Sequence, residues 1–314
     1  MDNIAFIFPG QGSQAIGMGK NLYHNHEAAR KLFDDADEIL NFPLSELCFK
    51  GPEEELTRTV NVQPAIFVTS LSCFEVTRLL LKEKYNNPVF VAGHSLGEYT
   101  ALVVAGVMSF KDALLLLRER GRLMNEAGEK NPGGMLALIG TSEEKAEVIC
   151  QKSGTEISNI NSPGQIIISG NNESLQKARV ICEEEGIRRI IPLKVSGAFH
   201  SRWLKSASDG LNSIIDDYSF KDASIPVVSN ITANMLDDAD EIKAELVNQI
   251  IRCVQWQKSV ENMINAGANK FVEFGHGQVL TNLIKRINQD VILYNVTDDS
   301  IESQIVSLQS SLYQ

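Results

Sequence analysis

The sequence predicts an α/β fold, with a parallel sheet at its core and a smaller subdomain inserted into the chain. Short apolar runs alternate with helical periodicity through residues 1–127, which is the rhythm of parallel βαβ units. Within residues 128–197 the order of elements is β-α-β-β-α-β, which is ferredoxin-like. We therefore expect residues 1–127 and 198–314 to form one catalytic domain around a ferredoxin-like subdomain at 128–197.

The elements of the large domain follow from hydrophobic patterning. Short apolar runs predict strands at 4–9, 88–95, 225–230, 270–275 and 291–296. Helical spacing predicts helices at 27–40, 63–84, 96–107, 109–128 and 204–217. The second of these helices is expected to begin just after Gln63-Pro64, because proline is tolerated in the first turn of a helix.

The subdomain repeats the same two signals over shorter distances. Apolar runs predict its strands at 135–140, 156–160, 165–170 and 187–193. Amphipathic segments predict its two helices at 142–152 and 172–186.

Composition excludes several classes of protein. The net charge of −11 argues against general nucleic-acid binding. The five cysteines contain no CxxC pair, which favours free thiols over disulfides or a zinc site. The N-terminus lacks a basic leader, and no apolar stretch approaches the ~20 residues of a membrane span. We expect a monomeric cytoplasmic enzyme with no metal, no cofactor and no membrane contact.

One candidate nucleophile lies in a GxSxG pattern, Gly93-His94-Ser95-Leu96-Gly97. An apolar run precedes it and a helical pattern follows, which is the context of a nucleophile elbow. The alternative is a tight glycine turn that carries a surface serine. The context favours Ser95 as a nucleophile, which requires a base to take its proton.

Five histidines are available as that base. His24 and His26 lie in a polar segment and are expected to be solvated. His94 lies inside the elbow, and its geometry directs it away from the neighbouring hydroxyl. His200 follows the last strand of the subdomain, where the chain re-enters the large domain, and active sites favour such junctions. We choose His200, with His276 as the second candidate.

Arg120 falls within the apolar stripe of the helix predicted at 109–128. Arg118 and Arg122 lie on the polar face and are expected to be solvated. A buried arginine is costly unless it meets an anion. Two explanations stay open: an ion pair with a protein carboxylate, or a bidentate clamp for a substrate carboxylate.

The glycine-rich segment at 8–20 follows the first strand but matches neither phosphate-loop nor dinucleotide-binding spacing. A turn of this kind can still offer a free backbone N–H. In GxSxG enzymes one oxyanion donor follows the serine, and the second comes from a separate strand-following loop. The amides of Leu96 and Gln11 fit these two places.

The ordered motifs resemble those of malonyl-CoA–acyl carrier protein transacylases. They are FPGQGSQ, QPAIF, GHSLGEY, RERGRLM, NINSPGQIIISG, SGAFHS and VQW, and they cover about residues 4–290. The resemblance implies an α/β-hydrolase-like large domain and ping-pong transfer of malonyl from malonyl-CoA to an acyl carrier protein. The pathway would be fatty-acid or polyketide synthesis.

The resemblance also implies a role for each matching residue. It makes Ser95 the acyl carrier, His200 the general base and acid, and Arg120 the holder of the malonyl carboxylate. It implies oxyanion amides at Gln11 and Leu96 and a carbonyl that orients the histidine at Gln255. Gln63, Asn161 and Phe199 would line the pocket. Two departures from the family pattern are Cys253 before VQW and His276 in place of a proline.

The stretch at 186–208 has five basic residues and no acidic ones in an otherwise acidic chain. They are Arg188, Arg189, Lys194, Arg202 and Lys205. Carrier proteins of this pathway are typically acidic and CoA carries phosphates, so we predict that the stretch docks one or both. An ordinary solvated surface is the alternative.

Two other functions remain to be weighed: a hydrolase that clears acyl groups from carrier proteins, and a non-catalytic scaffold that binds carriers. Arg120 argues against the hydrolase, which would have to accept neutral acyl chains. The intact set of Ser95, His200 and Gln255 argues against the scaffold.

Overall fold

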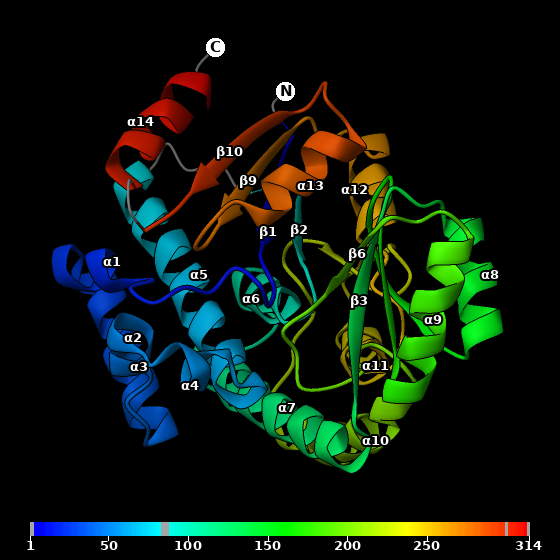
Figure 1. Cartoon of the computed structure of the whole chain (residues 1–314). Helices are drawn as coiled ribbons and strands as arrows, with labels where there is room; N and C mark the ends of the chain where they lie inside the picture. Colours follow the sequence, from blue (N-terminus) through cyan, green and yellow to red (C-terminus); the bar gives the residue numbers. More distant parts are fainter. Residues whose placement is uncertain (1–2, 83–87, 299–300, 313–314) are drawn as a thin grey trace.

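A computed structural model describes residues 3–82, 88–298 and 301–312. It confirms the α/β class: one six-stranded sheet and one four-stranded sheet share the chain (Figure 1). The large sheet has the order β10-β9-β1-β2-β7-β8, and only its edge strand β8 is antiparallel to its neighbour. Its strands are β1 (Ile4–Phe8), β2 (Phe90–Gly93), β7 (Val227–Val228), β8 (Met235–Leu236), β9 (Lys270–Phe274) and β10 (Ile292–Val296).

Helices cover the large sheet on both faces. Those before the inserted subdomain are α1 (Lys20–Asn25), α2 (Glu27–Leu40), α3 (Leu44–Lys50), α4 (Glu53–Thr57), α5 (Thr59–Leu81), α6 (Gly97–Val104) and α7 (Phe110–Lys130). Those after it are α10 (Lys205–Ile214), α11 (Ala239–Gln249), α12 (Trp256–Asn265), α13 (Val279–Ile287) and α14 (Ile301–Leu312).

The sequence of β1 explains why the sheet needs cover on both sides. All five of its residues are buried. Ile4, Phe6 and Phe8 enter the larger core, while Ala5 and Ile7 enter a second core with Trp256 of α12. Because successive side chains of a strand point to opposite faces, a wholly apolar strand indicates a sheet buried on both sides.

The smaller sheet is antiparallel and has the order β4-β5-β3-β6, which is the ferredoxin-like arrangement. Its elements are β3 (Gly133–Ile139), α8 (Glu143–Ser153), β4 (Glu156–Ser162), β5 (Gln165–Asn171), α9 (Asn172–Glu184) and β6 (Arg189–Pro192). These elements fall inside the range predicted for the subdomain, 128–197.

Alternation along this sheet divides it into a helix side and a cavity side. Leu136, Leu138 and Ile168 pack under α8 and α9, which lie on the outer side of the sheet (Figure 1). Ala137 and Ile167 face the other way, join the large core and line a cavity. The subdomain therefore supplies one side of the space between the two sheets.

Helix α5 differs from its prediction. It begins at Thr59, so Pro64 lies inside the helix and not just before it. Proline at the sixth position has no N–H to donate to the Val60 carbonyl, and Arg118 Nη1 donates to that carbonyl instead at 2.9 Å. By length and composition α5 could also cross a bilayer, but most of its apolar window is buried within the protein, as is typical of a core helix.

Helices α5 and α7 touch along their lengths, and Gly121 permits this close approach. A Cβ at Gly121 would lie 2.8 Å from the Thr59 carbonyl oxygen and 2.8 Å from Val60 Cα. The absence of a side chain there brings Arg120 of α7 within reach of Gln63 of α5.

Candidate active site

Three neighbouring parallel strands end at one edge of the large sheet, and the candidate site forms there. The chain leaves β1 into the turn that holds Gln11, β2 into Ser95, and β7 into Asn230. Because parallel strands present their carboxyl ends at the same edge, these three segments meet.

Ser95 lies on a sharp turn that only glycine neighbours allow. A Cβ at Gly93 would lie 1.9 Å from the carbonyl carbon of Gly97, and one at Gly97 would lie 2.2 Å from the Phe8 carbonyl oxygen. Ser95 itself has φ 53°, which is uncommon for a residue with a side chain. The two glycines of the GxSxG pattern are therefore a packing requirement of the elbow.

Asn230 holds the backbone of this turn from the end of β7. Its Oδ1 accepts from the Ser95 N–H at 2.8 Å, and its Nδ2 donates to the Gly93 carbonyl at 2.8 Å. This residue was missed by the sequence analysis, because only the order of strands in the sheet brings it to the elbow.

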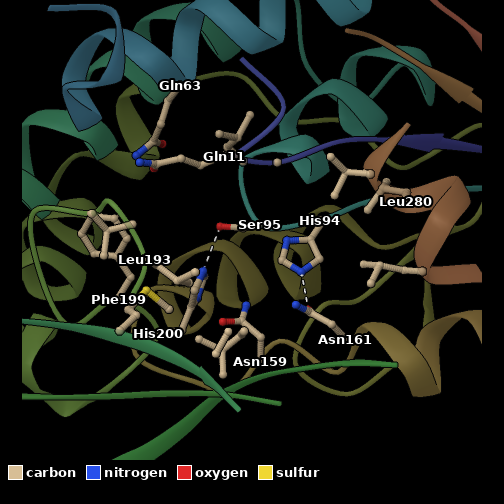
Figure 2. A pocket seen from close by; sticks show the side chains of 18 of the residues that line it. Gln11, Gln63, His94, Ser95, Asn159, Asn161, Leu193, Phe199, His200 and Leu280 are labelled. Atoms are coloured by element: carbon tan, nitrogen blue, oxygen red, sulfur yellow. Dashed lines mark hydrogen bonds between the residues drawn. The ribbon is translucent and has the colours of Figure 1, made fainter. Parts of the chain in front are cut away.

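His200 lies against the serine, as predicted. The Ser95 Oγ and His200 Nε2 atoms are 2.9 Å apart (Figure 2). His200 Nδ1 lies 2.7 Å from the backbone carbonyl oxygen of Gln249. A carbonyl oxygen can only accept, so Nδ1 carries the proton and Nε2 is free to accept the serine proton.

The prediction that Gln255 orients the histidine is wrong. Its carbonyl accepts from the N–H and the hydroxyl of Ser259 at 2.9 and 3.0 Å, at the start of α12. The carbonyl that binds His200 belongs to Gln249, the last residue of α11. A signal was present in the sequence, because Ile242, Leu246 and Gln249 share the buried face of that helix.

Burial and charge keep the His200 base neutral. The side chain is almost completely buried, and the nearby Arg120 guanidinium repels a second positive charge. Burial first, and Arg120 second, lower the pKa of His200 from the ordinary value of 6.5 to about 3.

Arg120 is only 1% exposed and contacts neutral oxygens. Nη1 donates to Gln63 Oε1 at 2.5 Å, and Nη2 donates to Gln249 Oε1 at 2.7 Å and to Ser95 Oγ at 3.1 Å. Within the described residues it forms no ion pair, and its Nε has no acceptor. The explanation by a direct ion pair with a protein carboxylate is therefore wrong.

Its neighbour Arg118 corrects a second expectation. The prediction placed this side chain in solvent, but it is about half buried and donates to the Val60 carbonyl and to Asn61 Oδ1. It also stacks over the ring of Phe42. Arg118 thus holds α7 to the start of α5, away from the cavity.

The predicted oxyanion donors border the same cavity as Ser95. Neither the Gln11 N–H nor the Leu96 N–H has an acceptor among the residues described. Both amides are thus available to an oxygen atom bound in front of Ser95.

The cavity in front of Ser95 has a volume of about 220 Å³ (Figure 2). The subdomain sheet lines one side of it, and loops and helices of the large domain line the rest. Asn161 of β4 lies in it, and its Oδ1 is 2.9 Å from His94 Nε2. Phe199 borders it beside His200. His94 therefore bonds to Asn161. His276, the second candidate for the base, bonds to Asp298.

The arrangement has the parts of an acyl-transfer site. It combines a hydroxyl nucleophile, a neutral base at hydrogen-bond distance, two free amides and one buried cation. The cation lies 3.1 Å from the nucleophilic oxygen, so it can bind an anionic group close to the reacting carbon.

Known proteins resemble this chain over nearly its whole length. The acyl transferase domain family matches residues 5–307. A malonyl CoA-acyl carrier protein transacylase of Bacillus subtilis (strain 168) is 44% identical, over 98% of both chains. An acyl carrier protein S-malonyltransferase from Vibrio cholerae has a TM-score of 0.92 at 36% identity, covering 97% of this chain and 100% of its own.

A further solved structure contains a partner. It is a malonyl-transacylase in complex with its type II PKS acyl-carrier protein, at TM-score 0.93 and 35% identity. The match covers 99% of this chain and 100% of that one.

The lowered pKa of His200 predicts an unusual pH dependence. A base is lost when pH falls through its pKa in the folded protein, so the loss should centre near pH 3 and not at the ordinary 6.5. We expect the rate of Ser95 acylation by p-nitrophenyl acetate, an ester without titrating groups, to stay constant from about pH 8 down to about pH 5. Stopped-flow absorbance measures it, with Ser95→Ala as the blank. A fall centred near 6.5 would contradict the assignment.

Proposed function

This chain belongs to the acyl transferase domain family, and from that membership we propose that it transfers malonyl groups from malonyl-CoA to an acyl carrier protein. The product supplies fatty-acid or polyketide chain extension. No cofactor takes part, and malonyl-CoA is a substrate. We propose the cytoplasm as its compartment, in keeping with five free cysteines of which four are buried.

The first half-reaction acylates Ser95. The Oγ atom attacks the thioester carbon while its proton moves to His200 Nε2 at 2.9 Å. The N–H groups of Gln11 and Leu96 stabilise the oxyanion that forms. Collapse breaks the C–S bond, and the thiolate of CoA leaves with the proton from His200.

The second half-reaction runs the same steps in reverse. The phosphopantetheine thiol of the carrier gives its proton to His200 Nε2, and its sulfur attacks the malonyl ester. When the tetrahedral intermediate collapses, Ser95 Oγ regains the proton and the malonyl thioester leaves. One base serves both halves because each step returns its proton.

The burial of Arg120 is the observation that carries this proposal. A guanidinium with only neutral acceptors, 3.1 Å from the nucleophilic oxygen, leaves its charge to be matched by a ligand. The malonyl carboxylate supplies that charge, while Gln63 and Gln249 fix the guanidinium from behind.

Intact-mass spectrometry tests the acyl-enzyme directly. Incubation with malonyl-CoA should add one malonyl group, and Ser95→Ala should remain unmodified. Addition of a carrier protein with its phosphopantetheine arm should then remove the group and malonylate the carrier. Loss of the adduct to water at the same rate with and without carrier would favour a hydrolase instead.

The Arg120→Ala variant separates malonyl recognition from general catalysis. We expect kcat/KM for malonyl-CoA to fall by about 100-fold or more, and that for acetyl-CoA by less than about tenfold, because only the malonyl group carries a free carboxylate. The matched control is Arg118→Ala, from the same helix but outside the cavity, which should retain both rates. An equal loss for malonyl and acetyl would overturn the clamp.

The predicted carrier-docking residues differ in their surroundings. Arg202 bonds to Glu156, and Lys205 bonds to Asp209, so these two charges are largely offset. Lys194 is 89% exposed and lies between Leu193 and Val195, which border the cavity. Its distance to the exposed Glu53 is 3.9 Å, a contact of little strength in water.

We propose that the carrier approaches over the exposed edge formed by Arg188, Arg189 and Lys194 beside the cavity. The phosphopantetheine arm would reach Ser95 past Leu193. Such charges mainly speed the association of an acidic carrier and fix its orientation, and they contribute less to its affinity.

The Lys194→Glu variant tests this surface. At low salt we expect the apparent KM for the carrier to rise about three- to tenfold, and the effect to shrink as salt screens the charges. Acylation of Ser95 by malonyl-CoA should not change. The control is Lys50→Glu, an exposed change on α3 away from the cavity. An unchanged KM at low salt would exclude this edge as the docking surface.

A further inference from the structure

Gln249 connects three parts of the active site through one side chain and one carbonyl. Its carbonyl accepts from His200, and its Oε1 accepts from Arg120 at 2.7 Å. Its Nε2 donates to the Ser95 carbonyl at 3.1 Å and to Glu98 Oε2. Every polar atom of the side chain therefore has a partner.

The direction of the Gln249 amide matters, because its two ends are chemically opposite. Arg120 has only donors, so Gln249 must present its oxygen there. If the amide were reversed, its NH₂ group would face the guanidinium and Arg120 would lose an acceptor. On the other side, the Ser95 carbonyl accepts from Gln249 Nε2 at 3.1 Å.

Glu98 supports the same direction of the Gln249 amide from its other end. It is the second residue of α6 and lies three residues after Ser95. Its side chain is 1% exposed, and its Oε1 accepts from the Asn230 N–H at 3.3 Å. Its Oε2 accepts from Gln249 Nε2. Both Glu98 oxygens thus accept here, although burial and the nearby Glu245 raise the pKa of this carboxyl. This arrangement places the NH₂ end of Gln249 at Glu98 and its oxygen end at Arg120.

We propose that Glu98 is a positioning residue for malonyl selection, which acts through the Gln249 amide to aim the Arg120 guanidinium at the substrate carboxylate. This inference rests on the proposed malonyl transfer. Glu98 does not touch the cavity, whereas Gln63 and Ser95, the other two acceptors of Arg120, border it directly.

The chain offers a matched control in Glu245. This carboxylate is also buried, lies one turn before Gln249 on α11, and accepts from Ser229 Oγ at 2.7 Å and the Ile231 N–H at 3.0 Å. It is buried like Glu98 and hydrogen-bonds neither Gln249 nor Ser95, although it is close enough for its charge to raise the pKa of Glu98. A change at Glu245 therefore reports what the loss of a buried carboxylate does to the fold.

The experiment compares Glu98→Gln with Glu245→Gln. The readout is the ratio of Ser95 acylation rate constants for malonyl-CoA and acetyl-CoA, measured per acylatable serine so that unfolded protein cancels. We expect Glu98→Gln to lower this ratio by about tenfold or more, because the new amide keeps its one oxygen for the Asn230 N–H and turns its NH₂ group toward Gln249 Nε2. Glu245→Gln should leave the ratio unchanged.

A double-mutant cycle tests the route through Gln249. Gln249→Met keeps the carbonyl that binds His200 but removes the amide, so it should lower the ratio by itself. Adding Glu98→Gln to Gln249→Met should then change the ratio no further. Independent, additive losses would overturn the relay.

Three outcomes separate the inference from the proposed function. If the unmodified enzyme forms no malonyl adduct, the proposed function fails. If it forms the adduct and Glu98→Gln keeps the unmodified ratio, the positioning role fails. Should Glu98→Gln not fold, Glu98→Asp replaces it: the shorter carboxylate withdraws from Gln249, and an unchanged ratio there equally refutes the role.

Discussion

The active site depends on a single buried positive charge. Arg120 lies out of water beside Ser95, and within the described chain three neutral oxygens hold it. Burial of an unmatched charge costs several kcal/mol unless hydrogen bonds and a counter-charge offset it. The acceptors come from α5, α11 and the elbow, so the packing of these segments around α7 is also the means by which the protein tolerates the charge. The same charge helps keep His200 neutral and so available as a base.

The nucleophile and the base both occupy strained backbone conformations. Ser95 has φ 53° and His200 has φ 55°, in the left-handed region that side chains disfavour. Around Ser95 the strain is maintained by side-chain amides: Asn230 binds the peptide groups on both sides of His94, and Gln249 binds the Ser95 carbonyl. These amides belong to segments more than a hundred residues further along the chain, so the elbow acquires its shape only in the complete fold.

Hydrophobic patterning predicted the elements well because each strand and helix carries its own signal. The strands at the two sheet centres are apolar runs, and the GxSxG glycines have a local packing reason. Gln255 was chosen from its place in the VQW motif, and only the path of the chain after α11 shows that the Gln249 carbonyl reaches His200 instead. The exposure of Arg118 was predicted wrongly because helical periodicity tells which way the side chain points from α7 but not that the start of α5 lies on that side. Likewise, no pattern within GHSLGEY indicates that Glu98 faces an amide from α11.

The two ends of the inserted subdomain position the cation and the base of the site, whereas its sheet lines the cavity. Arg120 lies on the helix that leads into the insertion, and His200 follows directly after it. The two ends meet at Gly128 and Gly197: a Cβ at Gly128 would lie 2.4 Å from the Ser196 carbonyl oxygen, and one at Gly197 would lie 3.2 Å from Gly128 Cα. The predicted boundaries at 128 and 197 fall at this contact. Because the backbones touch there, this contact fixes how far apart the segments that carry Arg120 and His200 lie. The subdomain sheet can then shape the cavity through residues such as Ala137 and Ile167 without itself carrying the reacting groups.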